Sequence, residues 1–417
     1  MTAAAALLEP AQPMAMPRPA VVWLDPGSGR PLRRVSDYVL AGDHAAADAV
    51  ARWPVVDGIP FLRPDRDALR RAALADLDRG DVDAARARLL ADQDPFAPLA
   101  PPAHAECLAL ADDVRAGRAT LREAMRRLGF GPVADYFAHR TCTPTFLSGL
   151  GLLAQHGRPR GPVVDVACGI GQFVRELAAR QVPAIGLDLV FAKVWLARRF
   201  LAPEAVLVCG DATRPPLALA SGAPATVFCH DAFYFLPDKA RAARAFLDLA
   251  GSDGRVLVGH AHNAAVDHGV AGTPLVPERY GALFPGATLF DDAAFAGAAL
   301  QGRPARPQDA SALGAVEAVS LAWPVRPSSP FWHGLLVPPD GAGLVLNPLL
   351  QEDADGRLAP LWPSARFAAE YVDAGYLHDP PVLARDARRA LDGSPANGRV
   401  RAELVRRRVL LAIPERW

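Results

Sequence analysis

Three aspartates follow short apolar runs in the middle of the chain. Asp165 lies in VVDVACGIGQ, Asp188 ends AIGLD, and Asp211 follows VLVCG. Asp188 comes about 20 residues after Asp165, the distance at which nucleotide-binding folds place an acid that accepts hydrogen bonds from ribose hydroxyls. Carboxylates at successive strand ends therefore predict a site for a nucleoside-type ligand.

Two glycines, Gly169 and Gly171, lie between Asp165 and the helical stretch that follows. Because glycine has no Cβ, a ligand can approach the backbone closely there and the chain can adopt unusual dihedral angles. The next helix points unpaired N–H groups and its positive dipole end at the ligand. A tight turn between a strand and a helix would also need glycine. The aspartates at the ends of successive strands are what favour a ligand site over such a turn.

Histidines gather after two further apolar runs. His230 and Tyr234 lie in FCHDAFYFLPD, and His260 and His262 lie in VLVGHAH, where alternate residues of a strand share one face. Imidazole titrates near neutral pH and can take a proton from a reacting group. We predict His230 and His262 as a base or orienting pair, with His260 and Tyr234 as further catalytic residues.

A metal site and ordinary hydrogen-bonded loop histidines are the alternatives for these side chains. A catalytic metal normally needs three protein ligands supported by further hydrogen bonds. The sequence shows no His-x-x-x-His spacing and no glutamate partner. We therefore predict no metal.

Strand and helix patterns alternate around these motifs. Strands are predicted at 163–167, 184–188, 205–209, 225–230 and 255–260, with helices at 171–180, 190–201 and 238–250. This alternation predicts an α/β fold with a doubly wound, mainly parallel sheet. Two later stretches, AVEAVSLAWPV and FWHGLLVPP, are predicted to finish the sheet as antiparallel strands.

The stretch VVDVACGIG resembles the first motif of the class I S-adenosylmethionine (SAM)-dependent methyltransferases, and the resemblance covers roughly residues 150–265. It implies a Rossmann-like fold, SAM as cofactor and S-adenosylhomocysteine as product. Against a dinucleotide site, the loop has no third glycine, and Phe173 begins the helix. The residues that the resemblance places on the donor are Asp165 and the backbone of Ala167, Gly169 and Gly171 for the methionine part, Asp188 for the ribose, Asp211 and Ala212 for the adenine, and Leu189 beside the adenine ring. We predict His230 near donor and acceptor as well, because it follows the fourth predicted strand at the carboxyl-end crevice of the sheet.

In this superfamily the segment before the first strand commonly folds over the donor. The resemblance therefore implies that Tyr136 and Arg140 line the acceptor pocket, and we predict Tyr234 and Asn263 as further substrate-binding residues. Arg140 suits an anionic acceptor, although an arginine on a helix surface is the plainer interpretation.

The remaining chain predicts accessory regions on both sides. Residues 1–19 are expected to form a disordered leader, 20–64 a small β module, 65–130 a helical accessory region, 131–340 the methyltransferase domain and 341–417 a C-terminal cap or extension. Within these regions, helical spacing predicts a hairpin over 65–94, a further helix over roughly 103–128 and a last helical segment over 133–157, interrupted at Pro144. The stretch RWPVVDGIPFLRPD resembles the end of a zinc-ribbon-type methyltransferase accessory domain, but the cysteines of that domain are missing. We carry no zinc over.

Composition limits the partners. The chain has 417 residues, 51% of them hydrophobic, and 45 basic residues balance 45 acidic ones. No global positive field attracts nucleic acid. The five cysteines are scattered, and neither a secretory signal nor a long apolar stretch is present. We expect a cytoplasmic protein without a membrane or nucleic-acid partner, and a homodimer stays open.

These features predict an enzyme that moves a methyl group from SAM to an O, N or S atom of a small molecule by in-line displacement. Two alternatives stay open. The first is methylation of RNA or protein, which the ribbon-like segment suggests. The second is a non-catalytic SAM-binding scaffold, in which the helical region binds a partner.

Overall fold

The chain is described by a computed structural model over residues 19–42, 51–93, 97, 99–219, 224–267, 271–324, 330–339, 341–371, 381–392 and 397–417. The predicted leader, apart from Pro19, lies outside the described residues. None of the described helices is long and apolar enough to span a membrane.

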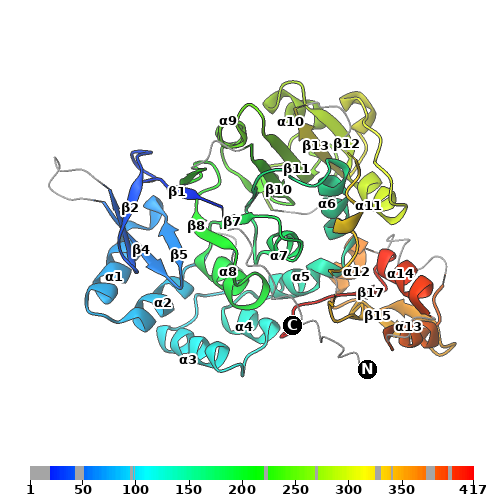
Figure 1. Cartoon of the computed structure of the whole chain (residues 1–417), viewed down its shortest axis with the longest axis horizontal. Helices are drawn as coiled ribbons and strands as arrows, with labels where there is room; N and C mark the ends of the chain where they lie inside the picture. The colour runs from blue at the N-terminus through cyan, green and yellow to red at the C-terminus, as the bar shows by residue number, and fades with distance from the viewer. Residues whose placement is uncertain are drawn as a thin grey trace, which may run out of the picture.

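An eleven-stranded sheet runs through the molecule in the order β12-β13-β11-β10-β6-β7-β8-β5-β4-β3-β2 (Figure 1). The strands β11, β10, β6, β7 and β8 lie side by side in this order and are all parallel, whereas β13 is antiparallel to β11 and to β12. The bounds of these strands are β6 Val163–Val166, β7 Ala184–Asp188, β8 Val206–Gly210, β10 Thr226–His230, β11 Arg255–His262, β12 Thr288–Asp291 and β13 Ala318–Trp323. The predicted Rossmann-like α/β fold is confirmed.

The strand order reverses beside β6, because the chain runs outward through β7 and β8 and then returns to β10 and β11 on the other side. Open α/β sheets bind ligands at the carboxyl ends of the strands where this reversal occurs. Asp165, which pairs with Gly186 on β7 and Phe228 on β10, therefore lies next to the expected crevice.

Helices cover both faces of the sheet and bury two separate apolar cores. One face carries α6 (Pro144–Gln155), α7 (Gln172–Ala178), α8 (Phe191–Leu196) with its π-helical continuation η3 (Ala197–Leu201), and α11 (Asp292–Leu300), which packs on α6. The opposite face carries α9 (Lys239–Ala250) and α10 (Pro277–Leu283). The layers are visible in Figure 1.

The N-terminal strands extend this sheet. The chain runs through β2 (Leu32–Ser36), β3 (Val39–Gly42), β4 (Arg52–Val56) and β5 (Ile59–Leu62), and β5 pairs in parallel with β8. A zinc-ribbon-type module is not supported, because these strands contain no cysteine and continue the main sheet. The strand β1 (Val21–Trp23) pairs separately with β9 (Leu217–Leu219).

The first two helices before β6 form the predicted hairpin, and the next predicted helix is divided in two. The hairpin is α1 (Asp67–Asp78) and α2 (Val82–Leu90). A single helix predicted near 103–128 is wrong: it divides into α3 (His104–Arg115) and α4 (Leu121–Arg127), since Gly117 adopts a φ of 73° between them. The segment predicted at 133–157 forms α5 (Val133–His139), the turn η2 (Arg140–Cys142) and α6, whose first residue is Pro144.

The C-terminal region packs around a third apolar core. It contains two small ribbons, β14 (Val345–Leu346) with β17 (Leu410–Leu411) and β15 (Leu350–Glu352) with β16 (Leu358–Pro360), and the helices α12 (Ala365–Tyr371), α13 (Ala384–Leu391) and α14 (Gly398–Arg406). The strand predicted in FWHGLLVPP is wrong, because its middle forms the 3-10 helix η6 (His333–Leu335). The outer strand of the sheet is β12 instead.

Candidate active site at the ends of the central strands

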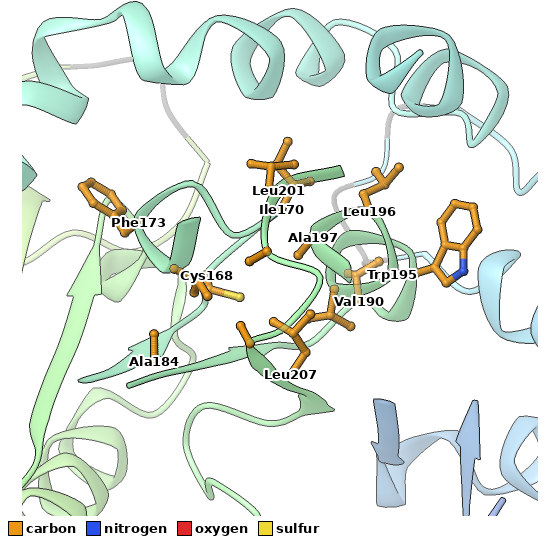
Figure 2. Packing of buried hydrophobic residues seen from close by; sticks show 14 of the residues in the cluster. Cys168, Ile170, Phe173, Ala184, Val190, Trp195, Leu196, Ala197, Leu201 and Leu207 are labelled. Carbon is orange, nitrogen blue, oxygen red and sulfur yellow. The ribbon is translucent and has the colours of Figure 1, made fainter. Parts of the chain in front are cut away.

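The loop after β6 has the left-handed backbone that its glycines permit. Ala167, Gly169 and Gly171 adopt φ values of 57°, 57° and 82°. A Cβ on Gly169 would lie 2.7 Å from the Phe137 ring, and one on Gly171 would lie 2.9 Å from Ala197. Figure 2 shows the loop residues Cys168 and Ile170 near side chains of α8 and η3. No side chain larger than hydrogen fits at either glycine without movement of a neighbour.

Asp188 supports this loop from the next strand. Its Oδ2 accepts a hydrogen bond from the Gly169 N–H at 2.9 Å, and its Oδ1 accepts one from the Val190 N–H at 3.0 Å. The Lys193 ammonium lies 4.0 Å from Oδ1. Asp188 therefore holds the loop in its left-handed conformation, a role that the sequence did not predict.

Asp165 is buried beneath the loop, and its Oδ2 has no hydrogen-bond partner among the described residues. Burial, reinforced by the nearby charge of Asp188, raises the pKa of Asp165 well above its usual range. A buried carboxylate oxygen without a partner is costly unless a ligand or water satisfies it. The position is suited to a bound ammonium group.

The third predicted aspartate lies at the end of β8. Asp211 accepts hydrogen bonds from the Thr213 N–H and hydroxyl, both at 2.8 Å, and Ala212 beside it is buried. Leu189 lies between β7 and α8, and its carbonyl accepts hydrogen bonds from the Arg63 guanidinium and the Cys209 thiol. The N-terminal extension thus contacts this end of the site through Arg63.

These residues fit the adenosyl donor that the fold family implies. The two glycines make a bare cradle at the loop, and Asp165 offers an unpaired carboxylate oxygen to an amino group. Asp188 and Asp211 end the two strands that follow in the sheet order. The assignment of each contact to methionine, ribose or adenine stays a prediction.

Helix α5 closes over this region, as the resemblance implied. The Phe137 ring contacts Gly169, and the Phe137 carbonyl accepts a hydrogen bond from Gln172 Nε2 at 3.0 Å. The Lys193 ammonium lies 5.5 Å from the centre of the Phe137 ring. Phe137 was missed by the sequence analysis, although the aromatic pair in DYF was a visible signal.

A second group of polar side chains surrounds Asp231, directly after β10. Its Oδ2 accepts a hydrogen bond from the Tyr136 hydroxyl at 2.5 Å and lies 2.9 Å from Arg140 Nη1, and its Oδ1 accepts one from the Tyr234 hydroxyl at 2.9 Å. Burial alone would raise the pKa of Asp231, but the charges of Arg140 and His260 lower it to about 2. The structure therefore brings three predicted site residues, Tyr136, Arg140 and Tyr234, together on Asp231, which was not among the predicted site residues.

His230 has protein partners at both ring nitrogens. Nδ1 lies 3.1 Å from Arg140 Nη2, and Nε2 lies 3.3 Å from the Ser148 hydroxyl. Burial, together with the Arg140 charge, lowers the pKa of His230 to about 3. Since Arg140 is always a donor, Nδ1 accepts and Nε2 carries the proton. His230 is therefore suited to orienting its neighbours, and the geometry does not favour it as a base.

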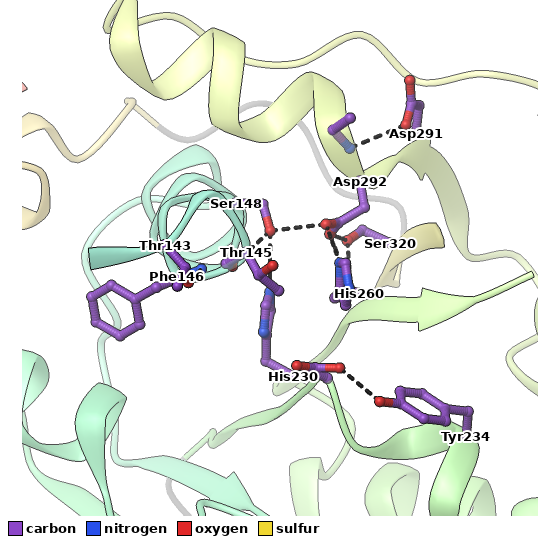
Figure 3. A network of polar contacts seen from close by, with 12 residues as sticks. Thr143, Thr145, Phe146, Ser148, His230, Tyr234, His260, Asp291, Asp292 and Ser320 are labelled. Atoms are coloured by element: carbon purple, nitrogen blue, oxygen red, sulfur yellow. Dashed lines mark hydrogen bonds and ion pairs between the residues drawn. The ribbon is translucent and has the colours of Figure 1, made fainter. Parts of the chain in front are cut away.

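His260 is held by an acid on α11. Its Nδ1 lies 2.8 Å from Asp292 Oδ2, and its backbone N–H donates to Asp292 Oδ1 at 3.0 Å. Asp292 also accepts hydrogen bonds from the hydroxyls of Ser320 at 2.6 Å and Ser148 at 2.9 Å (Figure 3). Burial alone would lower the pKa of His260, but the charges of Asp292 and Asp231 raise it to about 9.

His262 lies beside this cluster, and Asn263 does not. The His262 ring is 4.9 Å from the His260 ring and 4.7 Å from the Tyr234 ring, measured between centroids. Asn263 is fully buried, and its amide donates to the carbonyls of Gly314 and Val316 at 3.1 and 3.0 Å. We correct its prediction as a substrate-binding residue, because the amide fastens the turn before β13.

Two further site residues were missed by the sequence analysis. Ser148 is the one hydroxyl in the apolar stretch FLSGLGLLA, which was an available signal. Asp292 lies in LFDDAAF, a stretch with no distinguishing pattern, and only β12 and α11 bring it to His260.

Comparison with known proteins agrees with the central motif. Residues 163–254 match a family model described as a methyltransferase domain. The match supports a methyltransferase domain in this segment, and such a domain implies SAM as the cofactor. No curated protein sequence matches the chain.

Several solved structures share part of the fold. A TehB-like SAM-dependent methyltransferase of Corynebacterium glutamicum is 18% identical, with a TM-score of 0.31, covering 43% of this chain and 88% of that one. A SAM-dependent methyltransferase of Thermotoga maritima is 14% identical, with a TM-score of 0.32 and coverages of 48% and 97%. DesVI of Streptomyces venezuelae is 20% identical, with a TM-score of 0.26 and coverages of 32% and 57%.

Proposed function

Proceeding from the methyltransferase domain at residues 163–254, we propose that the chain transfers a methyl group from SAM to an O, N or S atom of a small molecule. The observation that carries the proposal is the unpaired carboxylate oxygen of Asp165 beneath a glycine loop in left-handed conformation. SAM supplies an activated methyl group on a sulfonium. The protein's own task is to bind, orient and exclude water.

Residues of the structure can be assigned to binding, to orienting the donor and to excluding water. The loop at Gly169 and Gly171 binds without side chains, and Asp188 fixes its conformation through the Gly169 N–H. Phe137 on α5 covers the loop and excludes water. The acceptor then lies on the side of the β10 and β11 ends, because the group around Asp231 gathers there.

Buried polar side chains gather on the acceptor side. Arg140 is buried, and it contacts both Asp231 and His230. A buried arginine whose positive charge is held by a carboxylate can also attract an acidic group of a ligand. We assign His230 an orienting role, since it holds Arg140 and Ser148 in place.

A two-stage experiment tests the proposal. Calorimetric titration of the full chain with SAM and with S-adenosylhomocysteine is expected to give one site for each ligand. A panel of small hydroxyl, amine and thiol compounds is then incubated with labelled SAM, and transfer of label to one of them is expected. Binding without transfer to any of these compounds contradicts a small-molecule acceptor and favours a scaffold or a macromolecular acceptor. Absence of binding to both ligands contradicts the whole proposal.

A further inference from the structure

Three side chains at the ends of β10 and β11 are grouped as metal ligands are. One ligand atom each from Asp231, His260 and His262 lies within 4.8 Å of the other two. Ligand atoms around a tetrahedral dication are about 3.3 Å apart for bonds of about 2.0 Å. The three atoms therefore need to approach by about 1.5 Å at most, which small side-chain rotations supply.

His260 is already oriented as a metal ligand. Its Nδ1 is held by Asp292, which leaves Nε2 for the ion. Histidines that bind metals usually donate the other ring N–H to a carboxylate, which fixes the tautomer and the ring plane. Asp292 is itself fixed by the hydroxyls of Ser320 and Ser148 (Figure 3). The supporting hydrogen bonds that the sequence did not reveal are therefore present.

Asp231 retains capacity for a further partner. An ionised carboxylate has about four acceptor positions, and the described contacts with Tyr136, Arg140 and Tyr234 use three of them. The side chains of Asp231 and His260 are 8% and 13% exposed, so neither is fully sealed from solvent.

We propose that Asp231, His260 and His262 bind a divalent transition-metal ion. Two imidazoles and one carboxylate favour an ion such as Zn²⁺, Fe²⁺ or Ni²⁺ over Mg²⁺ or Ca²⁺, which prefer oxygen ligands alone. Three protein ligands leave at least one position open, which is typical of a catalytic metal site.

Charge indicates what the open position takes. With neutral imidazole ligands, the cluster contains the carboxylates of Asp231 and Asp292, the Arg140 guanidinium and the dication. One positive charge is then in excess, and an anionic oxygen neutralises it. Because a metal lowers the pKa of a bound hydroxyl, an acidic hydroxyl compound, such as a phenol or an enol, suits this position. That this compound is the methyl acceptor rests on the proposed function, whereas the metal site itself does not.

The test uses the full chain freed of metal with a chelator and measures binding without SAM. Zn²⁺ is titrated in competition with a chromogenic chelator, and Co²⁺ is added separately for its visible spectrum. We expect about one equivalent of each ion. His262→Gln and Asp231→Asn are expected to weaken Zn²⁺ binding at least 100-fold, since loss of a mere supporting residue already costs 10–100-fold.

The matched control is His156→Gln, because His156 lies at the end of α6, outside the cluster. It is expected to bind Zn²⁺ as the unchanged protein does. Thermal unfolding checks each variant, and if Asp231→Asn fails to fold, His262→Gln decides alone. Equal Zn²⁺ binding by His262→Gln and His156→Gln, or no binding by the unchanged protein at micromolar free Zn²⁺, overturns the metal site.

The acceptor class is tested on the Co²⁺ form with tropolone, an acidic oxygen chelator. A change in the Co²⁺ spectrum supports the open position, and an unchanged spectrum overturns that part. SAM calorimetry on the metal-free protein separates the two proposals. Binding of SAM without Zn²⁺ binding removes only the metal site, and binding of Zn²⁺ without SAM binding removes only the proposed function.

Discussion

Asp292 and His260 form a buried pair, with Oδ2 of the acid 2.8 Å from Nδ1 of the ring. The pair connects α11 to β11 and sets the position of the whole histidine cluster. Replacement of Asp292 by Asn is expected to lower the free energy of unfolding by about 2 kcal/mol or more, because a charged hydrogen bond is lost in a buried place. Urea unfolding of Asp292→Asn and the unchanged protein measures this loss of stability.

The neighbouring acid provides the control for this prediction. Asp291 caps α11 through the Ala293 N–H at 3.1 Å. Asparagine caps helices as well as aspartate does, so Asp291→Asn is expected to change stability little. Equal losses of unfolding free energy in Asp292→Asn and Asp291→Asn would show that the charged pair with His260 adds no stability.

Gly169 and Gly80 share a left-handed backbone and differ in their surroundings. A Cβ on Gly169 meets Phe137 at 2.7 Å, whereas one on Gly80, at a φ of 80°, meets nothing within 4 Å. Alanine is expected to cost about 1 kcal/mol of backbone strain at both positions. Only Gly169→Ala is expected to lower the affinity for SAM, by at least tenfold. Calorimetric titration of both variants with SAM measures this. Equal affinities in the two variants would place the donor elsewhere.

Asp57 joins the N-terminal extension to the methyltransferase segment. Its carboxylate accepts hydrogen bonds from Arg86 and from Trp195 Nε1 at 2.8 Å, and it pairs with Arg199 at 2.8 Å. Asp57→Ala is expected to cost about 3–5 kcal/mol, because it leaves buried positive charge without its partner.

An exposed pair gives the comparison. Asp78 pairs with Arg52 at 2.6 Å, but both side chains are largely exposed. Asp78→Ala is expected to cost about 1 kcal/mol or less. The loss is read for both variants from urea unfolding, and a small cost at Asp57 would mean that the extension is held by apolar packing alone.

His156 makes stability depend on pH. Burial, with the charge of Arg255, lowers the pKa of His156 from 6.5 to about 3. Between these values the unfolded chain binds a proton that the folded chain does not, so stability falls as pH falls below 6.5. The slope from this group approaches about 1.4 kcal/mol per pH unit. His156→Gln is expected to remove that part of the slope, and parallel urea-unfolding profiles for the two proteins between pH 6 and 4 would refute it.

Local patterns were sufficient to predict the central strands and the glycine loop after β6. The five predicted parallel strands, the glycines at 169 and 171 and the aspartates at the strand ends are all in place, since apolar runs and bare turns are local signals. Strand alternation also predicted that His260 and His262 share one face, and their ring centroids lie 4.9 Å apart. It gave no indication that Tyr234 would lie beside His262.

Local sequence patterns could not predict contacts between segments that are far apart in the sequence. Asp292 reaches His260 only because β12 and β13 close the sheet, and Asp231 becomes the centre of a cluster only because α5 folds back with Tyr136 and Arg140. No spacing within one segment indicates either contact. The continuation of the sheet through β5 was missed for the same reason, because its pairing with β8 joins residues far apart in sequence.

A crystal structure of the full chain with S-adenosylhomocysteine would show where the donor binds. We expect the ligand against the backbone of Gly169 and Gly171, its amino group on Asp165, and its adenosine between Asp188 and Asp211. A ligand bound at any other place, or Asp165 left without contact to it, would show that the glycine loop is not the donor site.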